Sequence, residues 1–453
     1  MDGRPRWPRI RHCAPPTSAV TSSRQAEGEI LPALKKCNVS TLQLSNSSTF
    51  QRLLRQGVRV MRRLWLIGAL LVFVAAPPSG AQQPVIKVGV VVDVTGGASS
   101  LGVPERNTVL LYQDDLGTAQ GPNGPVRIEY VVTDGESDPT KAVIAAKRLI
   151  EEDRVVAVVC CTTSPASLAV LQTLQTNRVP NISLAAAVTI IEPVDQRRWI
   201  FKTPQTDRLM IGVITDHMGR RGIRSVAWLG FDDAFGQGGL VEFEKLAAQK
   251  GIEIAAKESF ARAATDVSTQ VTRAMGRNPQ AFLIWAIPPG ANVSQRNIRD
   301  LGITLPVYQS HGVANKTFLD LGAASVDGTF LPSGKILIAE QLPDTDKQKT
   351  ALLGYVERYE GRYGKGTRNT FGGHALDAML ILRPAIERTL WQGIRPENTG
   401  GFRAVLRDQI EHGTKELVGI TGIFNYTPTD HLGLDLRAAV MVEVRNGTWT
   451  PAR

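Results

Sequence analysis

Cysteine and histidine are scarce in this sequence of 453 residues, which has four Cys and six His. Two of the cysteines, Cys13 and Cys37, lie near the N-terminus, which leaves the adjacent pair Cys160 and Cys161. One adjacent pair cannot form a disulfide framework, and a bridge between neighbours is strained, so we expect two buried thiols at the end of a strand. No His is paired with Cys or carboxylates at ligand spacing, so we expect no metal site.

Motifs of nucleotide chemistry and of nucleophilic catalysis are also missing. The stretch Gly96-Gly97 has no GxGxxG continuation and no GxxxxGK[ST] run occurs, so we expect neither a dinucleotide cofactor nor ATP hydrolysis. Ser, His and Asp are all present, but there is no GxSxG elbow and no Cys with His in a known catalytic order, which disfavours an exported α/β hydrolase. We expect no catalytic residues, no cofactor and no enzyme activity.

The excess of positive charge is confined to the N-terminal stretch. The formal net charge is +10, but residues 1–81 hold 12 Lys/Arg against 3 Asp/Glu, and the other 372 residues hold 40 against 39. A nearly neutral body disfavours nucleic-acid binding. Since the chain is 43% hydrophobic and too long for one compact core, we expect two domains.

Residues 61–81 have the pattern of a cleaved signal peptide. Met61-Arg62-Arg63 is a short basic region, and the apolar run Leu64–Ala76 follows it. Small residues at Ser79 and Ala81 predict cleavage before Gln82, and hence a periplasmic protein. The alternative is a transmembrane anchor, but this apolar run is shorter than the roughly 20 residues that span a bilayer.

Residues 1–60 precede this signal and are rich in Arg, Pro, Ser and Thr, without sustained periodicity. We expect either that translation starts at Met61 or that these residues form a disordered extension. In both cases they contribute nothing to a folded core.

From Pro84 onward, β-branched runs alternate with amphipathic stretches, as in parallel strands joined by crossover helices. Val85–Val92 is apolar throughout and predicts a buried central strand, and Asp138-Pro139 has the residue types of a helix start. The repetition predicts two similar α/β lobes. We expect further strands at 126–133, 155–159, 180–183, 225–229, 252–259, 281–284 and 307–309, helices at 138–152, from about 164, and at 207–220, 238–250, 266–275, 293–301, 345–363 and 375–389, and strand-like character over 419–444.

Seven segments in this order and spacing resemble the periplasmic substrate-binding proteins of the branched-chain amino acid transporter type. They are Ile86–Gly102, Ser137–Ile150, Val158–Leu171, Asn181–Ala187, Phe231–Gly238, His311–Phe318 and Gly419–Asp435. The resemblance implies two Rossmann-like lobes joined by three crossover segments, with residues 84–204 plus 335–417 in lobe 1 and 205–334 plus 418–453 in lobe 2. It also implies a monomeric component of an ABC transporter, which delivers a small ligand to membrane permease subunits.

Ligands of open α/β sheets bind beyond the carboxyl ends of the strands, so the loops after the strands are candidate sites. Cys161, Thr162, Thr163 and Ser164 follow a predicted strand and open a helix, where hydroxyls and free N–H groups favour a carboxylate. The alternative is that Thr163 or Ser164 is only a helix cap. In the resembling family this loop holds the ligand carboxylate, and the backbone of Ala185, Ala186 and Ala187 contributes to the same anion.

Other positions depart from the amino-acid binders of that family. His311 stands where those proteins have an acidic residue for the ligand ammonium, Leu101 and Phe235 stand where they have Tyr, and Ala187 replaces a Thr. A buried ammonium without an acceptor is costly, which disfavours an α-amino acid.

The remaining candidate residues form an apolar surface that would suit a small carboxylate or amide with a hydrophobic or aromatic body. They are Leu101, Phe235, Ile287 and Pro288, with Trp285 as a further candidate. Two alternatives stay open. Asp93, Asp232 or Asp233 could approach an ammonium, although turn and cap roles are expected for the last two, and His311 could be a core residue. A ligand sensor of the same fold, signalling to a regulator, is the alternative function.

Overall fold

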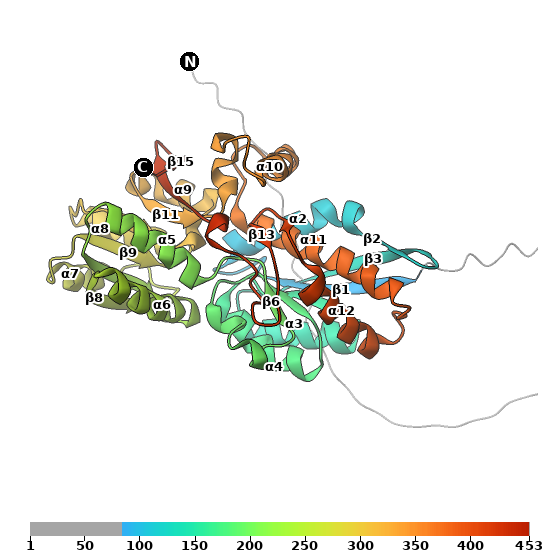
Figure 1. Cartoon of the computed structure of the whole chain (residues 1–453). Helices are drawn as coiled ribbons and strands as arrows, with labels where there is room; N and C mark the ends of the chain where they lie inside the picture. Colours follow the sequence, from blue (N-terminus) through green and yellow to red (C-terminus); the bar gives the residue numbers. More distant parts are fainter. Residues whose placement is uncertain (1–83, 453) are drawn as a thin grey trace, which may run out of the picture. The chain divides into compact units, whose positions relative to one another are not determined.

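The computed structural model describes residues 84–452, which form two α/β lobes (Figure 1). The predicted N-terminal extension, 1–60, and the predicted signal peptide, 61–81, lie outside the described residues. None of the described helices is long and apolar enough to cross a membrane.

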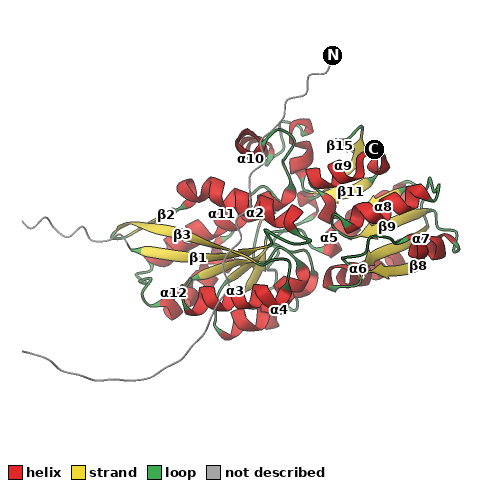
Figure 2. Ribbon diagram, turned by 180° about the vertical axis from the view of Figure 1, so that it is seen from behind, coloured by secondary structure: helices red, strands yellow, loops and turns green. Residues whose placement is uncertain are grey.

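The first lobe contains a six-stranded sheet in the order β2-β3-β1-β4-β5-β6. All neighbours are parallel except the hairpin of β2 and β3. Figure 2 shows α2 and α11 on one side of this sheet and α3 and α4 on the other, and α12 packs on α11. The elements are β1 (Val85–Val92), α2 (Ser99–Leu116), β2 (Thr118–Gly121), β3 (Gly124–Asp134), α3 (Pro139–Glu151), β4 (Ala157–Cys160), α4 (Ser164–Thr176), β5 (Asn181–Ser183), β6 (Ile200–Lys202), α11 (Thr370–Trp391) and α12 (Thr399–Gly413).

The second lobe contains a seven-stranded sheet in the order β15-β14-β11-β10-β9-β7-β8. Its strands β7 to β11 are parallel, and β14 and β15 add an antiparallel edge. The elements are α5 (Asp207–Arg220), β7 (Ser225–Phe231), α6 (Ala234–Lys250), β8 (Glu253–Phe260), α7 (Ser268–Met275), β9 (Ala281–Trp285), α8 (Gly290–Asp300), β10 (Val307–Gln309), α9 (Lys316–Gly322), β11 (Phe330–Ser333), β14 (Val440–Arg445) and β15 (Thr448–Pro451). Helix α10 (Lys349–Tyr363) and the short pair β12 (Leu417–Val418) and β13 (Ile423–Phe424) complete the fold.

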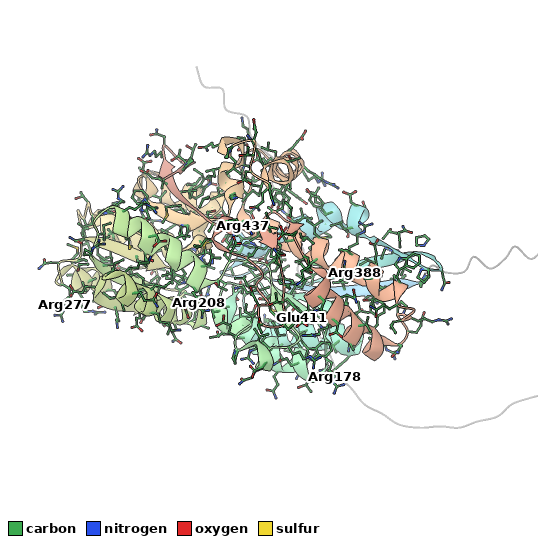
Figure 3. All side chains as sticks on the ribbon, viewed as in Figure 1. Arg178, Arg208, Arg277, Arg388, Glu411 and Arg437 are labelled. Carbon is green, nitrogen blue, oxygen red and sulfur yellow. A yellow bond between two sulfur atoms is a disulfide. The ribbon has the colours of Figure 1, made fainter. Side chains whose placement is uncertain are left out.

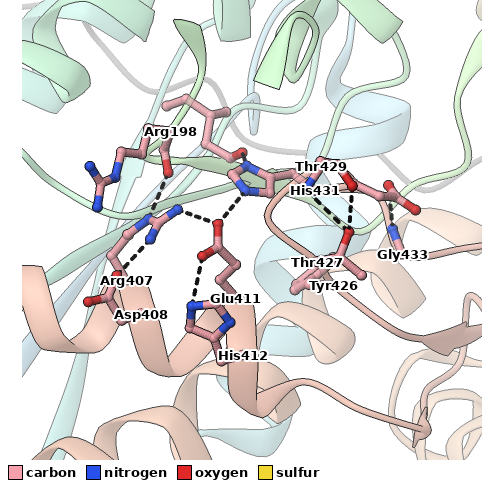
Figure 4. A network of polar contacts seen from close by, with 12 residues as sticks. Arg198, Arg407, Asp408, Glu411, His412, Tyr426, Thr427, Thr429, His431 and Gly433 are labelled. Carbon is pink, nitrogen blue, oxygen red and sulfur yellow. Dashed lines mark hydrogen bonds and ion pairs between the residues drawn. The ribbon is translucent and has the colours of Figure 1, made fainter. Parts of the chain in front are cut away.

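A buried polar network ties the C-terminal segment to the first lobe (Figure 4). Glu411 on α12, which is labelled in Figure 3, is 2% exposed and is hydrogen-bonded to Arg407 and, over 3.0 Å, to Nε2 of His431. The other ring nitrogen of His431 contacts the carbonyl oxygen of Ile200 in β6 at 2.8 Å. The chain thus returns past β6 before it enters β14 of the second sheet.

The predicted strands and helices are present, and β1 is central, between β3 and β4. Asp138 caps α3 as expected, because its carboxylate accepts hydrogen bonds from the N–H groups of Thr140 and Lys141. Helix α6 begins at Ala234 rather than at Gly238, and α11 begins at Thr370 rather than at Ala375. In both cases an Asp or Asn side chain caps an additional first turn, which the apolar pattern did not predict.

The elements that were not predicted are helices α2, α9 and α12 and strands β2, β6, β11, β12 and β15. Helix α2 contains Pro104 and buries few large apolar side chains, so its hydrophobic periodicity is weak. The stretch 419–444 is mostly irregular, with strand structure only in β13 and β14, because Gly and Asp residues make loops there.

The expectation of two free thiols at Cys160 and Cys161 is wrong, since the structure joins them in a disulfide. That expectation was based on the strain of a bridge between sequence neighbours. The peptide bond between the two residues is cis. Both side chains are completely buried at the end of β4.

Candidate functional site

The carboxyl ends of the strands of both sheets supply most of the lining of one pocket. The space between its walls is about 400 Å³, part of which is open to solvent. The lining residues are Leu101, Thr162, Thr163, Ser164, Leu184, Ala185, Ala186, Pro204, Phe235, Arg262, Ile287, His311, Gly312, Phe371 and His374. Nine of the twelve residues expected from the sequence are among them, whereas Cys161, Ala187 and Pro288 are not.

The three residues outside the lining are buried next to it. Cys161 is fully buried, and its N–H donates to the hydroxyl of Ser167. Ala187 is also fully buried, and its N–H donates to the hydroxyl of Ser164 over 3.2 Å. Pro288 is buried and joined to Pro289 by a cis peptide bond. Leu101 lines the pocket from the first turn of α2, although a loop was expected there.

The hydroxyl of Thr162 is already used inside the first lobe. It accepts a hydrogen bond from the N–H of Asp93 over 2.9 Å and donates its proton to Glu105 of α2. Burial raises the pKa of Glu105 well above its usual range and that of Asp93 to about 6, although hydrogen bonds from Ser137 and Thr163 oppose the second shift. The Thr162 hydroxyl therefore has little hydrogen-bonding capacity left for a ligand.

Thr163 and Ser164 open α4 at the pocket. Thr163 occupies the N-cap position without a side-chain capping bond, so the cap role that was its alternative is not seen. The hydroxyl oxygen of Ser164 accepts from the N–H of Ala187, which leaves its own proton available to a ligand. The N–H of Ala185 also donates within the chain, to Ser183, so fewer backbone donors remain than expected.

Arg262 is a lining residue that the sequence reasoning missed. It follows β8, and its Nε donates to Oδ2 of Asp233 over 2.5 Å while its guanidinium lies 4.6 Å from the ring centre of Phe231. These contacts fix the guanidinium of Arg262 in place and leave some of its five N–H donors for a ligand. Asp233 itself caps α6, as expected for a helix cap, by accepting from the N–H groups of Phe235 and Gly236.

Two uncharged imidazoles line the same pocket. Burial, reinforced by the positive charge of Lys202, lowers the pKa of His311 to about 3. Burial also lowers the pKa of His374, with smaller effects from His311 and Lys202. His374 belongs to α11 and was also missed, because its position at the pocket depends on how that helix packs.

The rest of the wall is apolar or aromatic. The ring of Phe235 lies 5.7 Å from that of Trp285 and 6.0 Å from that of His311, centre to centre. Trp285 is fully buried behind these rings and does not line the pocket. Within residues 84–452, no group of three or more His, Cys, Asp or Glu side chains is placed to hold a metal ion.

A family model described as "Periplasmic binding protein" matches residues 85–447. The chain belongs to the periplasmic binding protein family. This family and fold are those of binding proteins that are not enzymes, and they imply an extracytoplasmic solute-binding role. No curated protein matches this binding protein significantly.

Solved structures agree with the two-lobed fold. An extracellular ligand-binding receptor from Rhodopseudomonas palustris HaA2 is 30% identical, with a TM-score of 0.75 over 81% of this chain and 99% of that one. LivJ of Streptococcus pneumoniae, in complex with isoleucine, is 21% identical, with a TM-score of 0.68 over 81% and 97%. A solute-binding protein from Rhodopseudomonas palustris BisB5, in complex with 3,4-dihydroxybenzoic acid, is 20% identical, with a TM-score of 0.65 over 81% and 95%.

Proposed function

We propose that this protein is the solute-binding component of an ABC transporter and that it captures a small carboxylate or amide with a hydrophobic or aromatic body. One observation carries the proposal: of the fifteen lining residues, Arg262 is the one with a permanent charge. The remaining lining is apolar, hydroxyl-bearing or uncharged imidazole. Such a wall favours an anionic head group on an apolar body.

An α-amino acid fits this wall less well. Its ammonium needs a buried anionic acceptor, and neither Asp nor Glu is in the lining. Asp93 is 1% exposed and Glu105 is fully buried behind Thr162, and burial raises the pKa of both carboxyls. These two acids are therefore poor partners for a cation in the pocket.

Movement of the lobes is part of the proposal. We propose residues 84–204 plus 335–417 as lobe 1 and 205–334 plus 418–453 as lobe 2, with three connections acting as a hinge. A ligand that contacts both lobes would shift the population towards the closed form by its difference in affinity for the two forms. Export through the signal at 61–81 and delivery to permease subunits by a monomeric protein complete the proposal.

Calorimetry and thermal unfolding of the full-length protein at pH 7 test the ligand class. The probes are leucine, isoleucine, benzoate, 3-phenylpropionate, hexanoate and benzamide. We expect at least one acid or amide to bind and to come back chemically unchanged. At a hundredfold excess over Kd it would stabilise the protein by about 2.7 kcal/mol. Micromolar binding of leucine with no binding of the acids would overturn the proposed ligand class.

A further inference from the structure

The two imidazoles of the pocket have hydrogen-bonding capacity that the protein does not use. His311 is 6% exposed, and within residues 84–452 its buried Nδ1 has no hydrogen-bond partner. His374 is 2% exposed, and its Nδ1 contacts the hydroxyl of Thr421 at 2.8 Å, which leaves Nε2 for another group. Buried polar nitrogens are normally paired, so a ligand group is expected beside them.

The position of His311 is fixed by its neighbours. Its ring packs edge-on against Trp285, with ring centres 5.6 Å apart, and edge-on against Phe235 at 6.0 Å. Its backbone lies directly after β10, where Ser310 caps the turn by accepting from the N–H of Gly312. A ring held in this way can select a ligand group by position and not only by polarity.

The imidazoles and the cation enter the pocket from different elements. His311 follows β10 and His374 lies on α11. Arg262 follows β8 and donates to Asp233, which caps α6. The carboxylate and the group that meets the imidazoles can therefore be different parts of one ligand.

The chemistry of the two imidazoles decides which ligand group fits them. A neutral imidazole has one donor and one acceptor nitrogen. An ammonium can only donate and a carboxylate can only accept, whereas a hydroxyl does both and can pair with a neutral imidazole in either tautomer. A plain hydrocarbon end would leave both nitrogens unpaired.

We propose that the pocket selects acids that carry a hydroxyl group in addition to the carboxylate, with His311 and His374 hydrogen-bonding to that hydroxyl. This inference rests on the proposed function, because it adds a second polar contact to the same acid-binding pocket. The protein of Rhodopseudomonas palustris BisB5 that was solved with 3,4-dihydroxybenzoic acid shows that a hydroxylated aromatic acid can occupy a protein of this fold.

The test is calorimetry of the full-length protein with 4-hydroxybenzoate, 4-methoxybenzoate and benzoate. We expect 4-hydroxybenzoate to bind at least tenfold more tightly than either of the others, because only the hydroxyl can donate. His311→Phe keeps an aromatic ring against Phe235 and Trp285 but removes both nitrogens. It should lower the affinity for 4-hydroxybenzoate about tenfold and change that for benzoate less than twofold.

Two further variants keep the test decisive. His311→Asn retains a hydrogen-bonding group near the position of Nδ1 and should recover part of the preference, including where His311→Phe does not fold. His412→Phe changes a histidine of α12 whose side chain is 60% exposed and should behave as wild type. Equal affinities of the wild type for the three acids, or an unchanged preference in His311→Phe, would overturn the inference while leaving acid binding intact. Failure of every acid to bind would instead overturn the proposed function.

Discussion

The ammonium group of Lys202 donates a hydrogen bond to the carbonyl oxygen of Ala186 over 2.5 Å. Lys202 ends β6 and is fully buried, and Ala186 lines the pocket. Asp207, at the start of α5, is fully buried too and attracts the Lys202 charge. Burial lowers the pKa of Lys202 and raises that of Asp207, while their mutual attraction opposes both shifts. Lys202 thus holds the pocket wall at Ala186, beside the first connection between the sheets.

Replacing Lys202 should therefore destabilise the protein. Lys202→Met removes the hydrogen bond to Ala186 and the positive charge near Asp207, and we expect a loss of about 1–3 kcal/mol in the free energy of unfolding, measured by urea titration. Lys202→Met with Asp207→Asn removes both ionisable groups and should recover part of that loss. Lys87→Met breaks a pair with Asp153 in which the Lys87 side chain is 37% exposed, and it should cost less than about 1 kcal/mol. Equal effects of Lys202→Met and Lys87→Met would contradict a structural role for the buried ammonium of Lys202.

The pocket was partly predictable because loops after parallel strands converge at one edge of a sheet. Thr163, Ser164, Phe235 and His311 follow predicted strands and line the pocket. Arg262 obeys the same rule, since it follows β8, and the same reasoning extended by one loop would have found it.

Other features depend on tertiary packing that the sequence pattern does not reveal. The hydroxyl of Thr162 points to Glu105, which lies on α2, a helix whose weak periodicity gave no signal. His374 reaches the pocket only because α11 begins one turn earlier than its apolar pattern, where Asn369 accepts from the N–H of Gly372. The disulfide of Cys160 and Cys161 is likewise not predicted by any residue pattern in this stretch.

Acidification should weaken the fold through His311. Its pKa is about 3 in the folded protein, against an ordinary value near 6.5. Between these values the unfolded chain binds a proton that the folded chain does not, so this contribution to stability is complete above pH 6.5 and is lost as the pH falls towards 3. From pH 6.5 to 4.5, His311→Phe should lose less stability than wild type by on the order of 2 kcal/mol.

Urea unfolding at the two pH values measures this difference. Other buried acids titrate in the wild type and in the variant alike, so the comparison isolates His311. His412→Phe serves as the matched control, because that side chain is 60% exposed, and it should show the wild-type loss. An equal loss of stability in wild type and in His311→Phe would show that His311 is protonated to the same extent in the folded and unfolded states.

Two glycines within helices should respond in opposite directions to alanine. A Cβ at Gly236, in the first turn of α6, would lie 1.8 Å from the carbonyl oxygen of Phe231. Gly236→Ala must displace the turn that carries Phe235, and we expect a loss of about 1–3 kcal/mol with weaker acid binding. Gly354 on α10 is exposed and has nothing within 4 Å of such a Cβ, so Gly354→Ala should gain up to about 1 kcal/mol. Losses of equal size in both variants would show that the close contact at Gly236 is unimportant.

Arg262 should decide the affinity for acids. A charge-assisted hydrogen bond is worth about 1.5–3 kcal/mol, so Arg262→Gln should weaken the best acid by roughly 10- to 150-fold. Arg262→Lys keeps the charge but loses the planar, two-pronged arrangement of donors. Its affinity for the acid should lie between those of Arg262→Gln and wild type. Arg273→Gln is the matched control, since Arg273 on α7 pairs with Glu258 and does not line the pocket. Calorimetry of the three variants gives the ratios, and Arg273→Gln should stay within twofold of wild type. If Arg262→Gln bound the acid as wild type does, the carboxylate would have to be held by Thr163, Ser164 and the start of α4 alone, and the pocket would accept uncharged amides equally well.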